Sequence, residues 1–254
     1  MKYDFKDRVV LLTGGGSGIG RETAFQFAKS GAKVVIAGYR EESINRTFAE
    51  LQKISGDSHA IIADVTKIDD CFRAVKETIG KFGKIDILIN NAGYALKNDA
   101  GLPPKSVEIS EENYDYLLDI NLKGPFFMIQ AAAPYMIEKK YGRIVNLGST
   151  TGIRGHHGTT PYCAAKAGLM TMTMVMAREF GQHNITVNCV APGLVITEMQ
   201  ANTPKELLEK QAAQIALGRA GQPADVAHVI MFFSTEELFA TGQTLVVDGG
   251  NTMR

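Results

Sequence analysis

Short runs of mainly apolar and β-branched residues recur along the chain, separated by longer segments. The runs occupy residues 8–12, 33–37, 59–63, 85–89, 143–147, 186–190 and 244–247. Strands that are apolar on both faces are typical of a parallel sheet that is covered by helices on both sides. The pattern therefore predicts seven parallel strands that alternate with helices.

The longer segments between these runs show the spacing of apolar residues that is typical of helices. The clearest predicted helices are residues 43–53, 69–80, 111–139 and 162–180. Because crossovers between parallel strands are right-handed, successive helices can cover both faces of such a sheet. No linker-like stretch, charge block or repeat divides the chain, and Pro103-Pro104 fits a loop. We therefore predict one α/β domain over residues 1–254: a Rossmann-type, doubly wound, seven-stranded parallel sheet with helices on both faces.

Composition and charge narrow the classes of function. The 254 residues are 45% hydrophobic, which is enough for a buried core. Lys plus Arg and Asp plus Glu both number 27, so no overall field favours nucleic acid or an anionic membrane. The N-terminal segment mixes charges, and nowhere do eighteen apolar residues run together. We therefore expect a small-molecule ligand, no nucleic-acid partner and no membrane partner.

The three cysteines, Cys71, Cys163 and Cys189, are odd in number and far apart in the sequence. This arrangement fits neither a disulfide framework nor a zinc site. We therefore expect free thiols, no bound metal and a reducing, cytoplasmic location.

A glycine-rich turn directly follows the first predicted strand. It reads Thr13-Gly14-Gly15-Gly16-Ser17-Gly18-Ile19-Gly20. A strand, such a turn and a helix start place free backbone N–H groups and a helix N-terminus at one point, where a pyrophosphate can bind. The spacing G-x3-G-x-G departs from the G-x-G-x-x-G fingerprint, so the turn alone also fits an ordinary flexible connection.

The end of the second predicted strand bears on the choice of dinucleotide. An acidic residue there would bind the adenosine ribose of NAD, whereas its absence with a nearby arginine leaves room for the 2′-phosphate of NADP. Gly38 carries no carboxylate, and Arg40 offers a guanidinium suited to phosphate. The sequence therefore favours NADP, with NAD as the alternative. Arg40 could instead be a solvated charge before Glu41 and Glu42, which fit a helix start.

Three residues downstream of the fifth predicted strand supply acid–base chemistry. Tyr162 and Lys166 are four positions apart, so they share one face of a helix that Pro161 can open. A cation lowers the pKa of a nearby phenol, which can then exchange a proton with an alcohol–ketone pair. Ser149 follows the strand at residues 143–147 and can donate to the substrate oxygen as negative charge grows there. Each residue also fits a structural role, but their coincidence with the glycine turn favours hydride transfer.

Two other groups near these residues are ambiguous. His156 and His157 lie between Ser149 and Tyr162, but adjacent residues seldom share one face of an element, so we expect no direct catalytic role. Four methionines follow at every second position: Met170, Met172, Met174 and Met176. This spacing does not form one helical stripe, so some of them must face outward or contact a partner.

The order and spacing of these motifs resemble the short-chain dehydrogenase/reductase family over essentially the whole chain. Asp64-Val65 lies where the family contacts adenine, and Asn90-Asn91-Ala92-Gly93 matches its fourth-strand motif. Asn121 matches the family's active-site asparagine. The resemblance implies cofactor contacts at Gly14, Ser17, Gly18, Ile19, Gly20, Tyr39, Arg40, Asp64, Val65, Asn91, Ala92, Gly93, Tyr162, Lys166, Pro192, Gly193, Val195 and Thr197.

The resemblance also implies a catalytic set of four residues and an oxidoreductase that interconverts a secondary alcohol and a ketone. Tyr162 exchanges the hydroxyl proton, and Lys166 lowers the pKa of Tyr162 and binds the nicotinamide ribose. Ser149 polarises the carbonyl, and Asn121 positions a water that links the site to solvent. A bound nicotinamide carries the hydride.

Assembly and substrate are further expectations from the resemblance. The long central helices of the family commonly build a tetramer, so we expect a homotetramer. Residues 194–217 are similar to the family's substrate lid. The chain resembles 3-oxoacyl-[acyl-carrier-protein] reductases, but Phe127 and His183 stand where those enzymes tend to have arginines. A free alcohol, ketone or sugar is therefore placed ahead of a carrier-bound substrate. A non-catalytic dinucleotide sensor or scaffold is the alternative of another class, and the complete catalytic set disfavours it.

Overall fold

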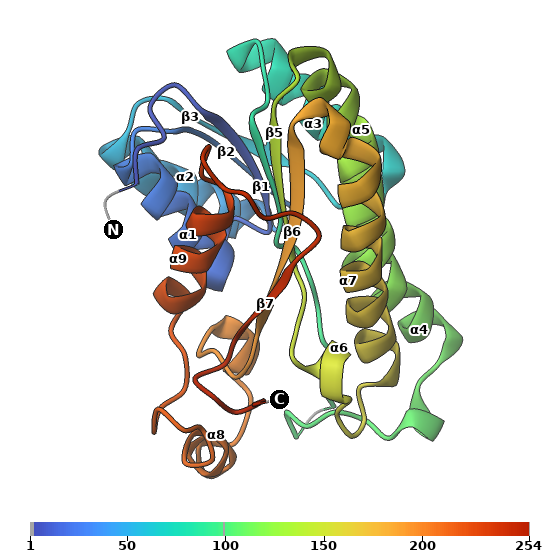
Figure 1. Ribbon diagram of the computed structural model, residues 1–254. Coiled ribbons are helices and arrows are strands. Elements are labelled where there is room, and N and C mark those ends of the chain that lie inside the picture. Colours follow the sequence, from blue (N-terminus) through green and yellow to red (C-terminus); the bar gives the residue numbers. More distant parts are fainter. Residues whose placement is uncertain (1–2, 99, 254) are drawn as a thin grey trace.

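Seven parallel strands form one sheet in the computed structural model, which describes residues 3–98 and 100–253 (Figure 1). The order across the sheet is β3-β2-β1-β4-β5-β6-β7. The strands are β1 (Val9–Thr13), β2 (Lys33–Gly38), β3 (Ser58–Ile62), β4 (Ile87–Asn90), β5 (Gly142–Leu147), β6 (Ile185–Pro192) and β7 (Thr244–Val247). All seven overlap the predicted strands, and their ends differ by two residues or fewer.

Helices cover both faces of the sheet, as predicted. One core cluster joins the sheet to α1 (Gly18–Lys29), α2 (Glu41–Ile54) and α9 (Pro223–Phe233). The other core cluster joins it to α3 (Ile68–Phe82), α5 (Gly124–Lys139) and α7 (Thr160–Phe180). Figure 1 shows these two groups of helices on opposite sides of the strands. The fold is therefore the predicted doubly wound Rossmann type.

The strand order locates the ligand crevice. From β1 the chain builds the sheet outward through β2 and β3, and it then returns to the other side of β1 with β4. In open α/β sheets, ligands bind beyond the carboxyl ends of the strands at the point where the order reverses. That point lies between β1 and β4, directly beside the glycine-rich turn.

The predicted helix at residues 111–139 is not a single α-helix. It consists of α4 (Glu111–Leu118), a π-helical turn (Asp119–Lys123, η2) and α5. In the π-helical turn, the N–H of Gly124 donates to the carbonyl of Asp119, five residues earlier. The side chain of Asn121 donates to the carbonyl of Leu117 at 3.0 Å, which satisfies a group of the preceding turn. Single π turns inside α-helices often mark functional positions.

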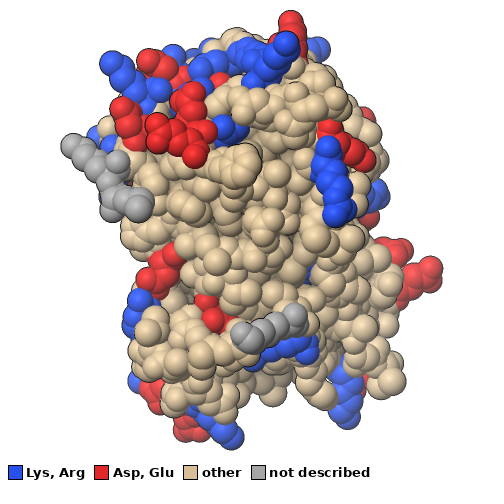
Figure 2. Space-filling view, in the orientation of Figure 1, with Lys and Arg blue, Asp and Glu red and all other residues tan. Residues whose placement is uncertain are grey.

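Short elements complete the fold. They are α6 (Thr151–Arg154), α8 (Lys205–Ala212) and three 3₁₀ turns, η1 (Ser106–Glu108), η3 (Gly181–His183) and η4 (Glu198–Gln200). Among the described residues, no helix is both long enough and apolar enough to cross a bilayer. On the face seen in Figure 2, positive and negative side chains lie close to one another, and neither sign dominates.

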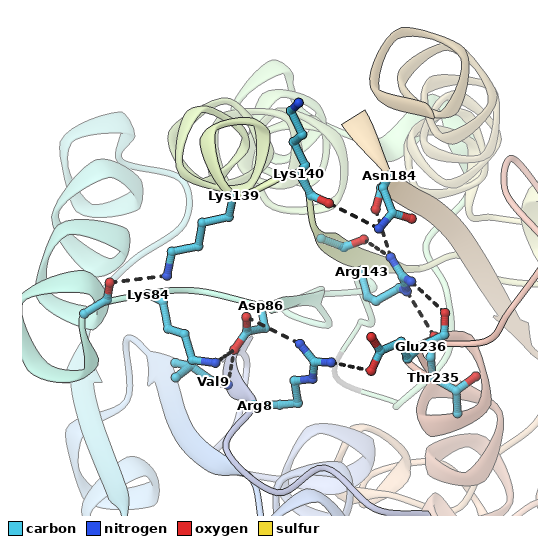
Figure 3. A network of polar contacts seen from close by, with 12 residues as sticks. Arg8, Val9, Lys84, Asp86, Lys139, Lys140, Arg143, Asn184, Thr235 and Glu236 are labelled. Carbon is cyan, nitrogen blue, oxygen red and sulfur yellow. Dashed lines mark hydrogen bonds and ion pairs between the residues drawn. The ribbon is translucent and has the colours of Figure 1, made fainter. Parts of the chain in front are cut away.

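A buried arginine connects elements at the amino ends of the strands, on the side opposite the ligand crevice (Figure 3). Arg143 lies near the start of β5, and it is 2% exposed. Its guanidinium donates to the carbonyls of Gly142 at 2.8 Å, Asn184 at 3.0 Å and Glu236 at 2.9 Å, and its Nε donates to Thr235 at 3.0 Å. These partners lie at the start of β5, directly before β6 and shortly after α9. Arg143 thus joins three elements on the side away from the ligand crevice.

Candidate active site

The glycine-rich turn is held in place by Asn91. The Nδ2 atom of Asn91 donates to the carbonyls of Thr13 at 3.0 Å and Gly14 at 3.1 Å. A Cβ atom at Gly20 would lie 2.3 Å from the Gly14 oxygen and 2.4 Å from Nδ2 of Asn91. Helix α1 can therefore approach the end of β1 this closely only because residue 20 is glycine.

The same turn offers the features of an anion site. Helix α1 begins at Gly18, and its first turn contains no acidic residue that would compete with an anion. Gly18 has a φ of +51°, which disfavours other residues, and a Cβ atom there would lie 3.1 Å from the side chain of Thr197. Ser17 precedes the helix in an extended conformation and makes no capping hydrogen bond with its side chain. The turn therefore faces the start of the predicted lid, and the first N–H groups of α1 have no acceptor within the helix.

Arg40 stands at the end of β2, where the sequence predicted an adenosine-side contact. Its side chain is exposed, and its guanidinium lies 5.6 Å from the ring centre of Tyr39. Glu41 and Glu42 occupy the first turn of α2, as expected for acids at a helix start. Among the described residues, Arg40 forms no ion pair. The guanidinium is thus open to an incoming anion.

Asp64 and Val65 follow β3 at the same edge of the sheet. Oδ1 of Asp64 accepts hydrogen bonds from the N–H of Thr66 at 3.0 Å and from its hydroxyl at 2.8 Å. The N–H of Asp64 donates to Asp70 at 2.9 Å. These bonds fix the loop after β3, so that Asp64 and the buried Val65 are held rigidly beside β2.

Ser149, Tyr162 and Lys166 converge beyond the carboxyl end of β5. Ser149 and Lys166 are buried, and Tyr162 is partly exposed. Nζ of Lys166 donates to the carbonyl of Leu147 at 2.7 Å and lies 5.6 Å from the ring centre of Tyr162. Pro161 lies in the first turn of α7, as predicted, so Tyr162 and Lys166 project from one helix face.

Burial is the largest influence on the pKa values of Tyr162 and Lys166. Burial raises the pKa of Tyr162 to about 12, and hydrogen bonding by Ser149 only partly opposes the increase. Burial lowers the pKa of Lys166 to about 8. The effect of burial on the Tyr162 phenol is the largest, and the ammonium of Lys166 donates to the carbonyl of Leu147. At neutral pH, Tyr162 is therefore held as the protonated phenol.

Asn121 reaches the same cluster from the π-helical turn. Its Nδ2 donates to the carbonyl of Tyr94 at 2.8 Å, and its Oδ1 accepts from the N–H of Tyr94 at 3.3 Å. A Cβ atom at Gly93 would lie 2.8 Å from Oδ1 of Asn121 and 3.3 Å from Nζ of Lys166. Gly93 thus leaves the space in which these two side chains approach each other. Ala92 precedes it, and its N–H donates to the hydroxyl of Thr13 at 3.1 Å.

The segment after β6 lies beside the loop that carries Ser149. The carbonyl of Pro192 accepts from the N–H of Thr150 at 3.0 Å, and the N–H of Gly193 donates to Val247 at 3.0 Å. Val195 forms an isolated parallel bridge with Gly221. The predicted nicotinamide contacts Pro192, Gly193, Val195 and Thr197 are therefore placed between the Ser149 loop and the glycine-rich turn.

Several residues that shape the site carried no signal of this role in the sequence. Nζ of Lys97, in the loop after β4, donates to the carbonyl of Met199, to Gln200 at 3.0 Å and to Thr203 at 2.8 Å. The Thr13 hydroxyl accepts from the N–H of Asn91 at 3.1 Å. The hydroxyl of Thr151 lies 2.9 Å from that of Ser149, two residues before it in the chain.

The structure also places the two ambiguous groups of the sequence. His156 and His157 are exposed, and Nδ1 of His156 lies 3.0 Å from the carbonyl of His157. The four alternating methionines point in different directions, since Met176 is buried and Met174 is exposed.

Comparison with known proteins agrees with this geometry. Residues 14–252 match the family model described as enoyl-(acyl carrier protein) reductase. The 3-oxoacyl-[acyl-carrier-protein] reductase FabG of Thermotoga maritima is 39% identical over 244 residues, 96% of this chain and 97% of the relative. The chain belongs to the short-chain dehydrogenase/reductase family.

Two further proteins show how broadly the similarity extends. The (2S)-[(R)-hydroxy(phenyl)methyl]succinyl-CoA dehydrogenase subunit BbsD of Thauera aromatica is 40% identical over 249 residues, 98% of each chain. The crystal structure of levodione reductase has a TM-score of 0.90 and 31% identity, and covers 97% of this chain and 98% of that chain. The protein is therefore an oxidoreductase of this family that uses a nicotinamide dinucleotide.

The described residues fit that cofactor. Gly14, Gly18 and Gly20 form a cradle from which Cβ atoms are excluded, and the helix start behind it supplies N–H donors for a pyrophosphate. The cradle leads to Thr197 and from there to the cluster of Ser149 and Tyr162 along the carboxyl ends of the strands. A dinucleotide is an elongated ligand, and these groups follow one edge of the sheet as such a ligand requires.

Proposed function

We propose that the enzyme interconverts a secondary alcohol and a ketone, with Tyr162 as the acid and base. The observation that carries this proposal is the convergence of Tyr162, Ser149, Lys166 and Asn121 at the carboxyl end of β5. A bound nicotinamide supplies the hydride for carbonyl reduction, and it accepts the hydride for alcohol oxidation.

Each of the four side chains has a different role in the rest of the reaction. In reduction, the phenol of Tyr162 donates its proton to the carbonyl oxygen, and the raised pKa keeps that proton in place until the oxygen becomes basic. The hydroxyl of Ser149 donates a hydrogen bond to the same oxygen as its negative charge grows. Lys166 orients the nicotinamide ribose, and Asn121 holds a water between Lys166 and solvent. In oxidation, the proton moves the other way.

The preferred cofactor is proposed to be NADP(H). Arg40 is exposed, unpaired among the described residues, and located after a β2 strand that ends in Gly38 without a carboxylate. A 2′-phosphate would gain a charge-assisted hydrogen bond there. The test is the ratio of kcat/KM for NADPH to that for NADH, in the wild type and in Arg40→Ala. We expect the wild type to prefer NADPH and the variant to lose the preference. Equal values in the wild type would overturn the proposal.

A second candidate substrate is a 3-oxoacyl thioester on acyl-carrier protein. It is favoured by the similarity to the FabG relatives, which are named for that activity. The free ketone is placed first because Phe127 and His183 supply no arginine for an acidic carrier protein. Residues 194–217 would form the lid over either substrate, and in the structure they carry η4 and α8.

One panel distinguishes these substrates. NADPH and NADH oxidation is followed with 1-decalone, with acetoacetyl-CoA and with acetoacetyl-acyl-carrier protein. Faster turnover of the free ketone supports the first proposal, and a carrier thioester that exceeds the CoA thioester by tenfold or more supports the second. If no member is reduced although NADPH binds, the carbonyl reductase proposal is wrong for these classes.

We also propose that the protein is a homotetramer whose subunits contact one another through α5 and α7. We propose a cytoplasmic location as well. Phe126 on α5 and Met174 and Val175 on α7 are exposed although they are apolar. A hollow of about 710 Å³ lies between α4, α5 and α7 and includes Phe127 and Met172. All three cysteines are free thiols, which suits a reducing compartment. Light scattering should give a mass near four times 27.5 kDa, and a monomer would contradict the assembly.

A further inference from the structure

The hydroxyl of Ser149 contacts Thr151, a residue that the catalytic scheme does not include. The N–H of Thr151 donates to Oγ of Ser149 at 3.2 Å. The hydroxyl of Thr151 lies 2.9 Å from the same oxygen. Both contacts come from one residue, two positions along the chain, so they restrict where the Ser149 hydroxyl can point.

The hydrogen-bonding capacity of a serine hydroxyl decides the direction of its proton. Such a hydroxyl has one donor and two acceptor positions. A backbone N–H can only donate, so Thr151 fills one acceptor position of Ser149. If the Thr151 hydroxyl fills the other, the single proton of Ser149 is free to donate toward Tyr162, or toward the substrate oxygen once a substrate is bound. That direction agrees with the effect of Ser149 on Tyr162, because its hydrogen bond lowers the pKa of the phenol against the effect of burial.

The surrounding loop leaves little freedom for another arrangement. The N–H of Gly152 donates to the carbonyl of Ser149 at 3.0 Å, which closes a tight turn. A Cβ atom added at Gly148 would lie 3.5 Å from Cε of Met170 in α7, and one added at Gly152 would lie 2.8 Å from the same atom. The turn is thus packed against α7, and Ser149 cannot easily move to find a different partner if the Thr151 hydroxyl is removed.

We propose that Thr151 is a positioning residue that orients the Ser149 hydroxyl as a donor to the reacting oxygen. Thr151 acts through Ser149 and does not itself contact the substrate. The inference rests on the proposed role of Ser149 in carbonyl reduction. It identifies the threonine of the Ser-x-Thr sequence as part of the polar network that serves the reaction.

Thr151→Val tests the proposal because valine keeps the shape and removes the hydroxyl. The substrate is whichever of 1-decalone and acetoacetyl-CoA the wild type reduces faster, and the corresponding alcohol serves for oxidation. We expect kcat to fall about five- to tenfold with the KM for the nicotinamide cofactor unchanged, as for the loss of one hydrogen bond. The pH profile for oxidation should shift upward, because Ser149 would stabilise the Tyr162 phenolate less well.

Two companion variants separate orientation from folding. Thr151→Ser restores a hydroxyl at the same place and should recover the wild-type kcat and pH profile. Thr159→Val removes a hydroxyl that bonds to the carbonyl of His156 at 2.9 Å, near the site but away from Ser149, and should shift neither. Equal losses in Thr151→Val and Thr151→Ser would overturn the proposal.

Ser149→Ala distinguishes this inference from the proposed function. If Ser149→Ala loses turnover while Thr151→Val keeps the wild-type kcat and pH profile, the role of Thr151 is wrong and the function stands. If Ser149→Ala keeps full turnover, the role of Ser149 itself is wrong, and the inference falls with it.

Discussion

At the scale of single residues, the site depends on groups whose environment changes their protonation. Tyr162 and Lys166 project from one face of α7, and burial moves their pKa values in opposite directions. It stabilises the neutral form of each group, since a charge is costly to remove from water. Tyr162 remains a phenol over the whole physiological range, whereas the charge of Lys166 depends on a pKa of about 8. Of these two residues, Lys166 is therefore the one whose pKa lies closer to neutral pH.

The pH dependence of carbonyl reduction follows from Lys166. If its ammonium is needed to hold the nicotinamide ribose, kcat/KM should be level below about pH 7 and fall as the pH rises through about 8. Lys166→Arg keeps a cation that does not titrate in this range, so its activity should be lower but level. The measurement is the pH profile of both proteins with NADPH in excess of substrate. The same decline in both would assign it to another group.

The same shift also affects stability. The pKa of Lys166 is lower in the folded protein than in the unfolded chain, so between about pH 8 and 10 the unfolded chain binds more protons at this residue. Its contribution to the free energy of unfolding therefore increases with pH across that window. Below it, Lys166 is charged in both states, and the cost of burying the charge is present in full.

At the scale of elements, the loop after β4 is joined to the segment after β6. The ammonium of Lys97 has three N–H donors, and three acceptors of the lid, at Met199, Gln200 and Thr203, take them up. A Cβ atom at Gly101 would lie 1.8 Å from the carbonyl oxygen of Asn202, so the two backbones are in direct contact. The lid is thus docked on this loop by one side chain and one glycine.

Replacement of Lys97 should loosen the lid without unfolding the domain. In Lys97→Met we expect faster amide hydrogen exchange over residues 198–203 and a KM for the ketone raised about tenfold, as three hydrogen bonds to a charged group are lost. Lys105→Met is the matched control, since Lys105 lies in the same loop and its described ion pair is with Glu108 at 3.9 Å. Unchanged exchange over residues 198–203 in Lys97→Met would show that other contacts hold the lid.

The elements also show what a sequence can and cannot predict. The strands were predictable because residues buried on both faces of a parallel sheet must be apolar at consecutive positions. The break between α4 and α5 was not, because Asn121 is held by Tyr94, which is distant in the sequence. The docking of Lys97 likewise joins residues more than a hundred positions apart. Local patterns carry no record of such partners.

Some features of the candidate site were also predictable from the sequence, and others were not. The order of the glycine-rich turn, Ser149, Tyr162 and Lys166 predicted which residues meet beyond the sheet. It did not predict that the pKa of Tyr162 is raised, because the largest cause is the burial of the phenol, which depends on the tertiary fold. Residue types at given spacings indicate the chemistry, whereas burial and hydrogen-bond direction decide the protonation states.

At the scale of the whole molecule, the ligand edge and the opposite edge of the sheet are built differently. The ligand edge carries the glycine-rich turn and the lid, and the opposite edge carries the network of Figure 3. There the carboxylate of Asp86 accepts from the N–H of Val9 at 2.8 Å and pairs with Lys84 at 2.8 Å. Arg143 adds its bonds to four carbonyls. We infer that this edge stabilises the domain while the other edge performs the chemistry.

Arg143→Lys tests that division. Lysine keeps the charge but cannot reach the carbonyls in several directions at once, which leaves buried acceptors unpaired. We expect the free energy of unfolding to fall by about 2–3 kcal/mol, with the kcat of the remaining folded enzyme unchanged. Arg46→Lys, on the exposed side of α2, should leave the free energy of unfolding unchanged and serves as the control. Equal stability of Arg143→Lys and the wild type would contradict this assignment.

The central claim is that the phenol of Tyr162 moves the proton while the nicotinamide carries the hydride. Tyr162→Phe tests it most directly, because phenylalanine keeps the ring and removes only the hydroxyl. The measurement pairs NADPH binding by titration with single-turnover reduction of the preferred ketone. We predict a Kd for NADPH within about twofold of the wild type and a rate reduced about 10²- to 10⁴-fold. A variant that binds NADPH and reduces the ketone at a rate close to that of the wild type would contradict the account.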